Sequence, residues 1–217
     1  MNRAELKTRA KALLKPQFVT VLLAAIISDL LIGLLSSGPA VNVFPKDGQA
    51  FTFSFSFSTS GMSLIGTIIA LVIAGPLAVG ATKIFATVTA GQTAKLEQMF
   101  DPFKTNFVTC FLANLVSGIF IALYSLLLIV PGVMKAYSYA MVPYVLVKEP
   151  QLSAMEALHR SESLMKGHRM ELFMLHLSFI AWMLLVIVTL GLALLWVAPY
   201  ANVTETLFFD KIYGAAE

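Results

Sequence analysis

Long apolar runs recur along the chain and limit its fold more than any other feature. Six windows, most of them about 20 residues long, contain few charged side chains. A helix of about 20 apolar residues spans the hydrocarbon core of a bilayer, which is about 30 Å thick. Only 12% of the 217 residues are charged, against roughly 25% in soluble domains. The sequence therefore predicts an all-α, polytopic membrane protein that forms one domain over residues 1–217.

The predicted transmembrane spans cover residues 17–36, 61–85, 106–130, 133–147, 172–189 and 192–213. The fourth span is short, so it either thins the bilayer or continues beyond it. For the last two spans, one long helix that ends at Val197 is a rival interpretation.

Residues 1–15 have the pattern of an amphipathic helix. Leu6, Ala10 and Leu14 fall on one face at helical spacing, and five basic residues occupy the rest of the surface. The pattern predicts a helix in the headgroup layer, with its cations on anionic lipid. A frayed basic tail is the alternative, and Pro16 separates either one from the first span.

Residues 37–60 form the longest segment without a helical pattern. An Asp47-Gly48 pair is followed by FTFSFSFS, in which phenylalanine alternates with small polar residues. Such alternation after an Asp-Gly turn is typical of a β-hairpin. The prediction is an extracellular hairpin-like loop with one phenylalanine face on lipid or on the helices. A strand that binds a partner at its edge is the alternative.

Two Gly-containing dipeptides, Pro131-Gly132 and Leu190-Gly191, predict tight turns between spans three and four and between spans five and six. Ser153 and Glu156 form a Ser-x-x-Glu capping box, which predicts the start of a helix outside the membrane. Gly167 stands where a left-handed C-terminal cap belongs. Within this helix, Glu156–Arg160 and Glu162–Lys166 have the spacing of stabilising ion pairs.

The distribution of basic residues predicts the orientation of the chain. If the N-terminus is cytoplasmic, Lys46 and Lys135 are the only two of 15 lysines and arginines on the outer side, as the positive-inside rule favours. Both termini and the connections 86–105 and 148–169 are then cytoplasmic. The net charge of +3 comes from cations beside apolar spans, so anionic lipid and not nucleic acid is the expected partner.

Two charges inside the predicted spans mark the candidate site. Asp29 lies about 10 Å below the outer end of span one, and Lys135 lies about 5 Å below the turn that opens span four. Charged groups at such depth are costly unless they are paired, so the leading hypothesis is an Asp29–Lys135 pair. Ser138 and Tyr139 share the face of Lys135. These four residues either line a polar cavity for an ion or lipid headgroup or fix the order of the helices.

Glu205, His176 and Tyr200 are weaker candidates for a polar site, since each lies within or near the end of an apolar span. The sequence contains no His-Glu-x-x-His, Walker A or Cys-x-x-Cys motif. No catalytic residue, metal ligand or cofactor is predicted, and an enzyme is not expected.

The order of several motifs resembles a known family. These motifs are PGVMKAYSYAMVPYVL, LSAMEAL, SESLMKGHRMELFMLHLSFIAW and LGLALLWVAPY, with AELKTRAKALLK near the N-terminus. Together they resemble the domain of unknown function 975 family of bacterial multi-pass membrane proteins. The resemblance implies a six-helix protein of the bacterial cell membrane and brings no established activity.

Two classes of function stay open at this point. The first is a non-enzymatic envelope protein that assembles with, or regulates, other membrane components, including a second copy of itself. The second is a transporter or lipid-handling protein with a polar cavity near the outer leaflet around Asp29 and Lys135.

Overall fold

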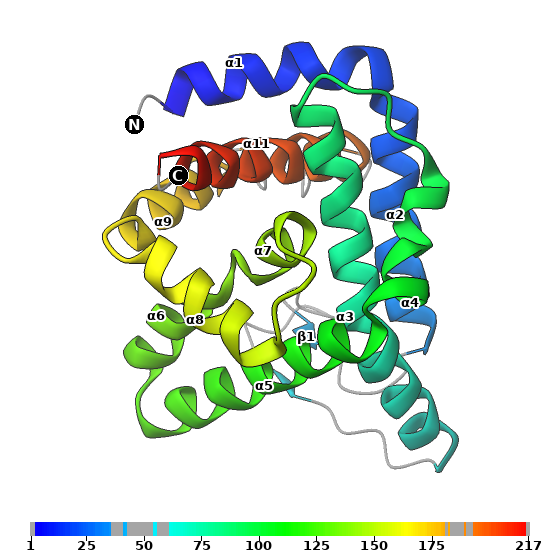
Figure 1. The fold of residues 1–217 in the computed structure, drawn as a ribbon, viewed down its shortest axis with the longest axis vertical. Helices are drawn as coiled ribbons and strands as arrows, with labels where there is room; N and C mark the ends of the chain where they lie inside the picture. Colours follow the sequence, from blue (N-terminus) through cyan, green and yellow to red (C-terminus); the bar gives the residue numbers. More distant parts are fainter. Residues whose placement is uncertain are drawn as a thin grey trace.

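In the computed structural model of the protein, the described residues are 3–35, 41–42, 54–55, 61–180, 182, 189 and 193–215. Nearly all of them are helical, which confirms the all-α class (Figure 1). The helices are α1 Arg3–Leu14, α2 Phe18–Leu35, α3 Gly61–Thr89, α4 Asp101–Thr105, α5 Phe107–Leu127, α6 Ile129–Tyr139, α7 Val142–Lys148, α8 Ala154–Met165, α9 Arg169–Leu177 and α11 Leu194–Gly214, with 3-10 turns at Lys15–Gln17 and Leu96–Phe100.

Three helical stretches are long and apolar enough to cross a membrane among the described residues: Ala4–Ser28, Ile68–Thr89 and Phe107–Leu127. The first of them contains the 3-10 turn at Lys15–Gln17, where Figure 1 shows the chain bending from α1 into α2. The chain is thus compatible with a membrane protein, and six spans stay a prediction.

The predicted apolar face of α1 exists and is covered by protein. Leu6, Ala10 and Leu14 are buried, because α11 lies alongside α1 (Figure 1). The Lys7 Nζ donates a hydrogen bond to the Ser178 carbonyl oxygen over 3.1 Å. This face therefore anchors the N-terminus to the C-terminal helix, and contact of the remaining cations with anionic lipid stays a prediction.

Helix α5 lies across α3 instead of running beside it along its length (Figure 1). At the crossing, a Cβ on Gly75 would overlap the Cys110 carbonyl group of α5, and one on Gly80 would overlap the Met99 carbonyl group. Glycine is needed at both positions because the backbones approach too closely for any side chain. Helices that pack this closely are typical of membrane proteins, where small residues form the interfaces.

The turn between α5 and α6 lies three residues before the predicted one. The single extended residue is Leu128, with φ −160° and ψ 139°, and Pro131-Gly132 belongs to the first turns of α6. Proline is tolerated there because the first amide groups of a helix have no intrahelical partner. Gly132 serves a different purpose, since a Cβ at this position would overlap Ser125 of α5.

The sequence predicted one span over residues 133–147, but the structure divides this stretch into two helices. The chain breaks at Ala140–Met141, and Pro143 occupies the first turn of α7. Val142, Tyr144, Val145 and Leu146 are each at most 4% exposed. These four side chains cover more than half of the helix circumference, so α7 is largely enclosed by protein, and its remaining side carries the partly exposed Pro143 and Val147.

The boundaries of α8 agree with the prediction. The Ser153 amide donates to Glu156 Oε2 over 2.8 Å, and the Glu156 amide donates to Ser153 Oγ over 3.4 Å. Gly167 has a φ of +91°, as expected for a left-handed cap. The ion pairs differ from those expected, because Arg160 contacts Glu149 and Glu162 contacts Lys135 and Arg169.

Two predictions fall largely outside the described residues. Val41 pairs with Phe55 and Asn42 with Ser54 in an antiparallel arrangement, whereas the rest of the hairpin-like loop is not described. The predicted turn at Leu190-Gly191 is also outside the described residues. The last described helix begins at Leu194.

Candidate functional site

The candidate site is centred on Lys135, which lies on α6. Its Nζ is 2.7 Å from Glu162 Oε1 of α8, and the two side chains are 21% and 32% exposed. The Arg169 Nη2, at the start of α9, is 3.7 Å from the same oxygen. One carboxylate therefore holds two cations and joins three helices.

Aromatic rings complete the surroundings of the Lys135 ammonium. Its Nζ lies 5.2 Å from the centre of the Tyr124 ring and 5.4 Å from that of Tyr139. An ammonium at this distance is attracted by the negative face of a ring. The site can thus keep a charged lysine in partly apolar surroundings.

This pairing corrects part of the predicted transmembrane topology. Lys135 was expected near the outer face and Glu162 on the cytoplasmic side, yet the two groups are in hydrogen-bond contact. They cannot lie on opposite sides of a hydrocarbon core about 30 Å thick. The reason is that α6, with 11 residues, is only about 16 Å long and runs beside α8. The side chain of Asp29 lies outside the described residues, so its pairing with Lys135 stays a prediction.

Ser138 and Tyr139 do not share one role. Ser138 is fully buried, its Oγ donates to the Met134 carbonyl over 2.7 Å, and its own carbonyl accepts from Ser161 Oγ over 2.8 Å. Its polar groups are therefore used in holding α6 against α8. Tyr139, by contrast, lines a cavity described below.

Two of the weaker candidates meet. The His176 Nε2 lies 3.6 Å from Glu205 Oε1 of α11, and the Nδ1 lies 3.4 Å from the Tyr137 hydroxyl. Tyr200, the third candidate, is elsewhere: its hydroxyl donates to the Lys7 carbonyl over 3.3 Å. The structure thus places two ionic contacts, at Lys135 and at His176, along the helices that follow α5.

Comparison with known families gave a match to this part of the chain. Residues 124–216 match the family described as protein of unknown function, DUF975. The family suggested by the sequence is confirmed over this segment. Both ionic contacts lie within the DUF975 segment, whereas α1 to α4 precede it. Comparison with curated proteins and with solved structures gave no match.

The DUF975 segment also contains a polar cluster that the sequence did not reveal. Glu149 Oε1 accepts from Arg160 Nε over 3.2 Å and from the Tyr213 hydroxyl over 3.0 Å. Nearby, Asp210 Oδ1 accepts from the buried Tyr144 hydroxyl over 2.6 Å. The cluster ties the end of α7 to α8 and α11. Its hydrogen-bonded partners are up to 66 residues apart, so local spacing gives no signal for it.

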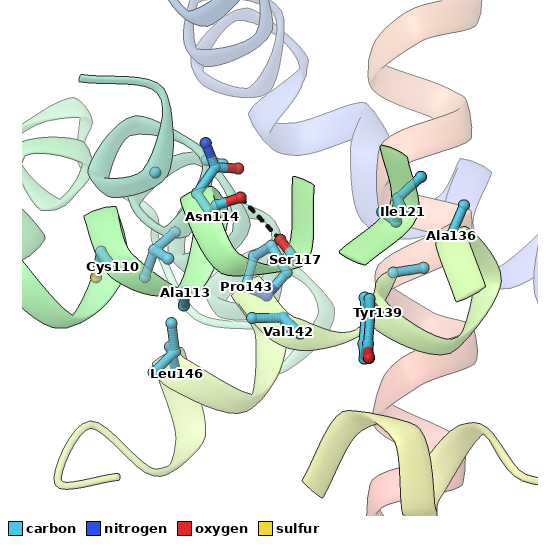
Figure 2. A pocket seen from close by; sticks show the side chains of 14 residues that line it. Cys110, Ala113, Asn114, Ser117, Ile121, Ala136, Tyr139, Val142, Pro143 and Leu146 are labelled. Carbon is cyan, nitrogen blue, oxygen red and sulfur yellow. Dashed lines mark hydrogen bonds between the residues drawn. The ribbon is translucent and has the colours of Figure 1, made fainter. Parts of the chain in front are cut away.

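A cavity of about 230 Å³ lies where the DUF975 segment meets the helices before it (Figure 2). Small and apolar side chains form most of its wall, and Asn114, Ser117 and Tyr139 add polar atoms. The lining comes from α3, α5 and the α6–α7 stretch. Tyr139 thus contacts both the cavity and the Lys135 ammonium.

The His176–Glu205 contact predicts a pH-dependent stability. The Glu205 carboxylate, 3.6 Å from His176 Nε2, favours the charged imidazolium and raises the pKa of His176 above its usual value. A group whose pKa is raised on folding contributes its full stabilisation below its unfolded pKa, about 6.5, and loses it as the pH rises through the folded value. We expect a loss of about 0.5 kcal/mol, because the His176 side chain is 42% exposed and exposed pairs are weak.

Thermal unfolding in detergent between pH 5.5 and 8.5 would measure this effect. Glu205→Gln should flatten the pH profile, whereas His159→Gln, at an exposed position on α8, should leave it unchanged. A profile that Glu205→Gln does not alter would contradict the role given to the pair.

Proposed function

We propose that the protein is a non-enzymatic, multi-pass membrane protein that assembles with, or regulates, other membrane components. The observation that carries this proposal is the uncovered apolar surface where α5 turns into α6. Leu126, Leu127, Leu128 and Val130 are between 65% and 86% exposed. An apolar surface of this kind marks a contact with lipid or with another protein.

The polar groups of the candidate site support the same proposal. Glu162 neutralises Lys135 and Arg169, and Glu205 faces His176. These charges are used in contacts between helices of the chain, as expected if they hold a scaffold together. A transport site for a charged substrate would instead use ionic groups that are free to bind it inside the membrane.

A photo-reactive amino acid at Leu127, introduced in cells and activated in native membranes, tests the proposal. We expect a discrete adduct with a second protein chain, either another copy or a different membrane protein, and no such adduct from Met141, which is fully buried. Leu127→Asn, combined with a reactive residue at Leu126, should reduce the yield. Adducts with lipid alone at Leu126, Leu127 and Val130 would overturn assembly through this surface.

A transporter or lipid-handling protein is the second candidate, favoured by the contact of Tyr139 with both Lys135 and the cavity. If a water-filled path reaches Lys135, a cysteine in its place should react with a charged thiol reagent added to one side or the other of the membrane. No reaction in a folded Lys135→Cys variant would argue against such a path.

A further inference from the structure

The cavity between α3, α5 and the α6–α7 stretch has the properties of a site for part of a larger molecule. Its volume of about 230 Å³ is below the range of about 300–1,000 Å³ that is typical of sites for whole small molecules. It is also partly open to the outside. A ligand that fits would place one apolar portion inside and leave the remainder outside.

One polar group in the wall has no hydrogen-bond partner among the described residues. Asn114 is one of the residues that line the cavity (Figure 2), and no hydrogen bond of its carboxamide occurs within the part of the chain that the structure describes. The hydrogen bond between Asn114 and Ser117 uses the main-chain carbonyl of Asn114, which accepts from Ser117 Oγ over 2.9 Å. An unpaired amide in an apolar span costs several kcal/mol in hydrocarbon, where water does not compensate it.

The surroundings of the opening indicate which molecule could both fill the apolar cavity and bond to the Asn114 carboxamide. Helix α5 is one of the stretches able to cross a membrane, and Gly118 and Ile119, which follow the cavity residue Ser117, are exposed. The cavity is thus walled in part by α5, a helix that also carries an exposed apolar surface at Leu112, Ile119 and Leu123. Lipid hydrocarbon is the medium that contacts such a surface.

We propose that this cavity binds one acyl chain of a membrane phospholipid, with an ester oxygen of that lipid accepting a hydrogen bond from the Asn114 carboxamide. Ala113, Ile121, Val142 and Leu146 supply the apolar wall. The site deepens the lipid-handling alternative and does not require assembly with a partner, because its lining does not include the exposed residues 126–130 at the turn into α6.

Photo-labelling of the purified full chain tests the proposal. The probe is phosphatidylglycerol with a diazirine on one acyl chain, reconstituted into vesicles of the same lipid. We expect label on Ile121, Val142 and Leu146 in addition to the exposed face of α5. Ser117→Phe should fill the cavity and reduce the label on Val142 and Leu146 about tenfold.

Gly118→Phe is the matched control, because a Cβ at Gly118 has no atom within 4 Å. This variant should retain the label inside the cavity. Equal labelling of Val142 and Leu146 in both variants, or label confined to the exposed face of α5 in the unaltered protein, would overturn the proposal.

If Ser117→Phe fails to fold, the Asn114→Leu variant provides a second test of lipid binding in the cavity. Removal of the unpaired amide should raise the unfolding temperature of the lipid-free protein in detergent. The same change should weaken the stabilisation by added phosphatidylglycerol, with an apparent affinity about fivefold lower, as expected for one lost hydrogen bond. An unchanged response to the lipid would refute the role of Asn114 in binding it.

Discussion

Replacing Gly75 with alanine is expected to destabilise the protein by about 3 kcal/mol or more. The added methyl group would overlap the Cys110 carbonyl oxygen and lie 2.8 Å from its carbon, where α3 crosses α5. Overpacking typically costs about 1–3 kcal/mol, and the upper end applies because the obstacle is backbone, which moves only with the whole helix. Thermal unfolding in detergent, with the yield of monodisperse protein, measures the loss.

Gly118→Ala provides the comparison for this change. Gly118 lies on α5 eight residues after Cys110, and a Cβ there meets no other atom within 4 Å. Because alanine favours a helix over glycine by about 0.5–1 kcal/mol, this variant should be as stable as the original or slightly more stable. If both alanine variants behaved alike, the close crossing of α3 and α5 would be in doubt.

Glu162→Gln is expected to cost about 2 kcal/mol, more than Lys135→Leu at about 1 kcal/mol. The asymmetry arises because Glu162 faces two cations. Without the carboxylate, Lys135 and Arg169 repel each other, whereas without Lys135 the carboxylate keeps Arg169. In a double-mutant cycle followed by thermal unfolding, the combined variant should lose less stability than the sum of the single changes.

Lys166→Leu separates the observed pair from the one that the sequence suggested. Lys166 follows Glu162 at the spacing of a helical ion pair, but it is exposed and the carboxylate contacts Lys135. The change at Lys166 should therefore alter stability by no more than about 0.5 kcal/mol. A larger loss from Lys166→Leu than from Lys135→Leu, or strict additivity in the cycle, would contradict the structure.

Local signals in the sequence predicted local structure well. The capping box at Ser153 and the left-handed Gly167 gave the limits of α8, because both depend on hydrogen bonds and dihedral angles within a few residues. The separation of α1 from α2 at Pro16 and the apolar face of α1 were predicted for the same reason. The motifs after Tyr124 were specific enough to predict the family.

Features that depend on distant contacts were not predictable in this way. Pro131-Gly132 was expected to be a turn, yet proline also fits a first helical turn and the glycine is needed for contact with Ser125. The partner of Lys135 lies 27 residues away, and no pattern of spacing distinguishes Glu162 from other carboxylates. Hydropathy alone also did not distinguish a helix that spans lipid from α7, most of whose side chains are buried in protein.

The burial of α7 has a consequence for where the folding unit ends. The region shared with the family begins at Tyr124, near the end of α5, but α7 packs against α3, which precedes that boundary. A fragment cut at Tyr124 would expose one side of a helix that contains Val145, a residue with no exposed surface in the intact chain. The DUF975 segment therefore does not contain all of its own packing contacts, because α3, which precedes it, covers one side of α7.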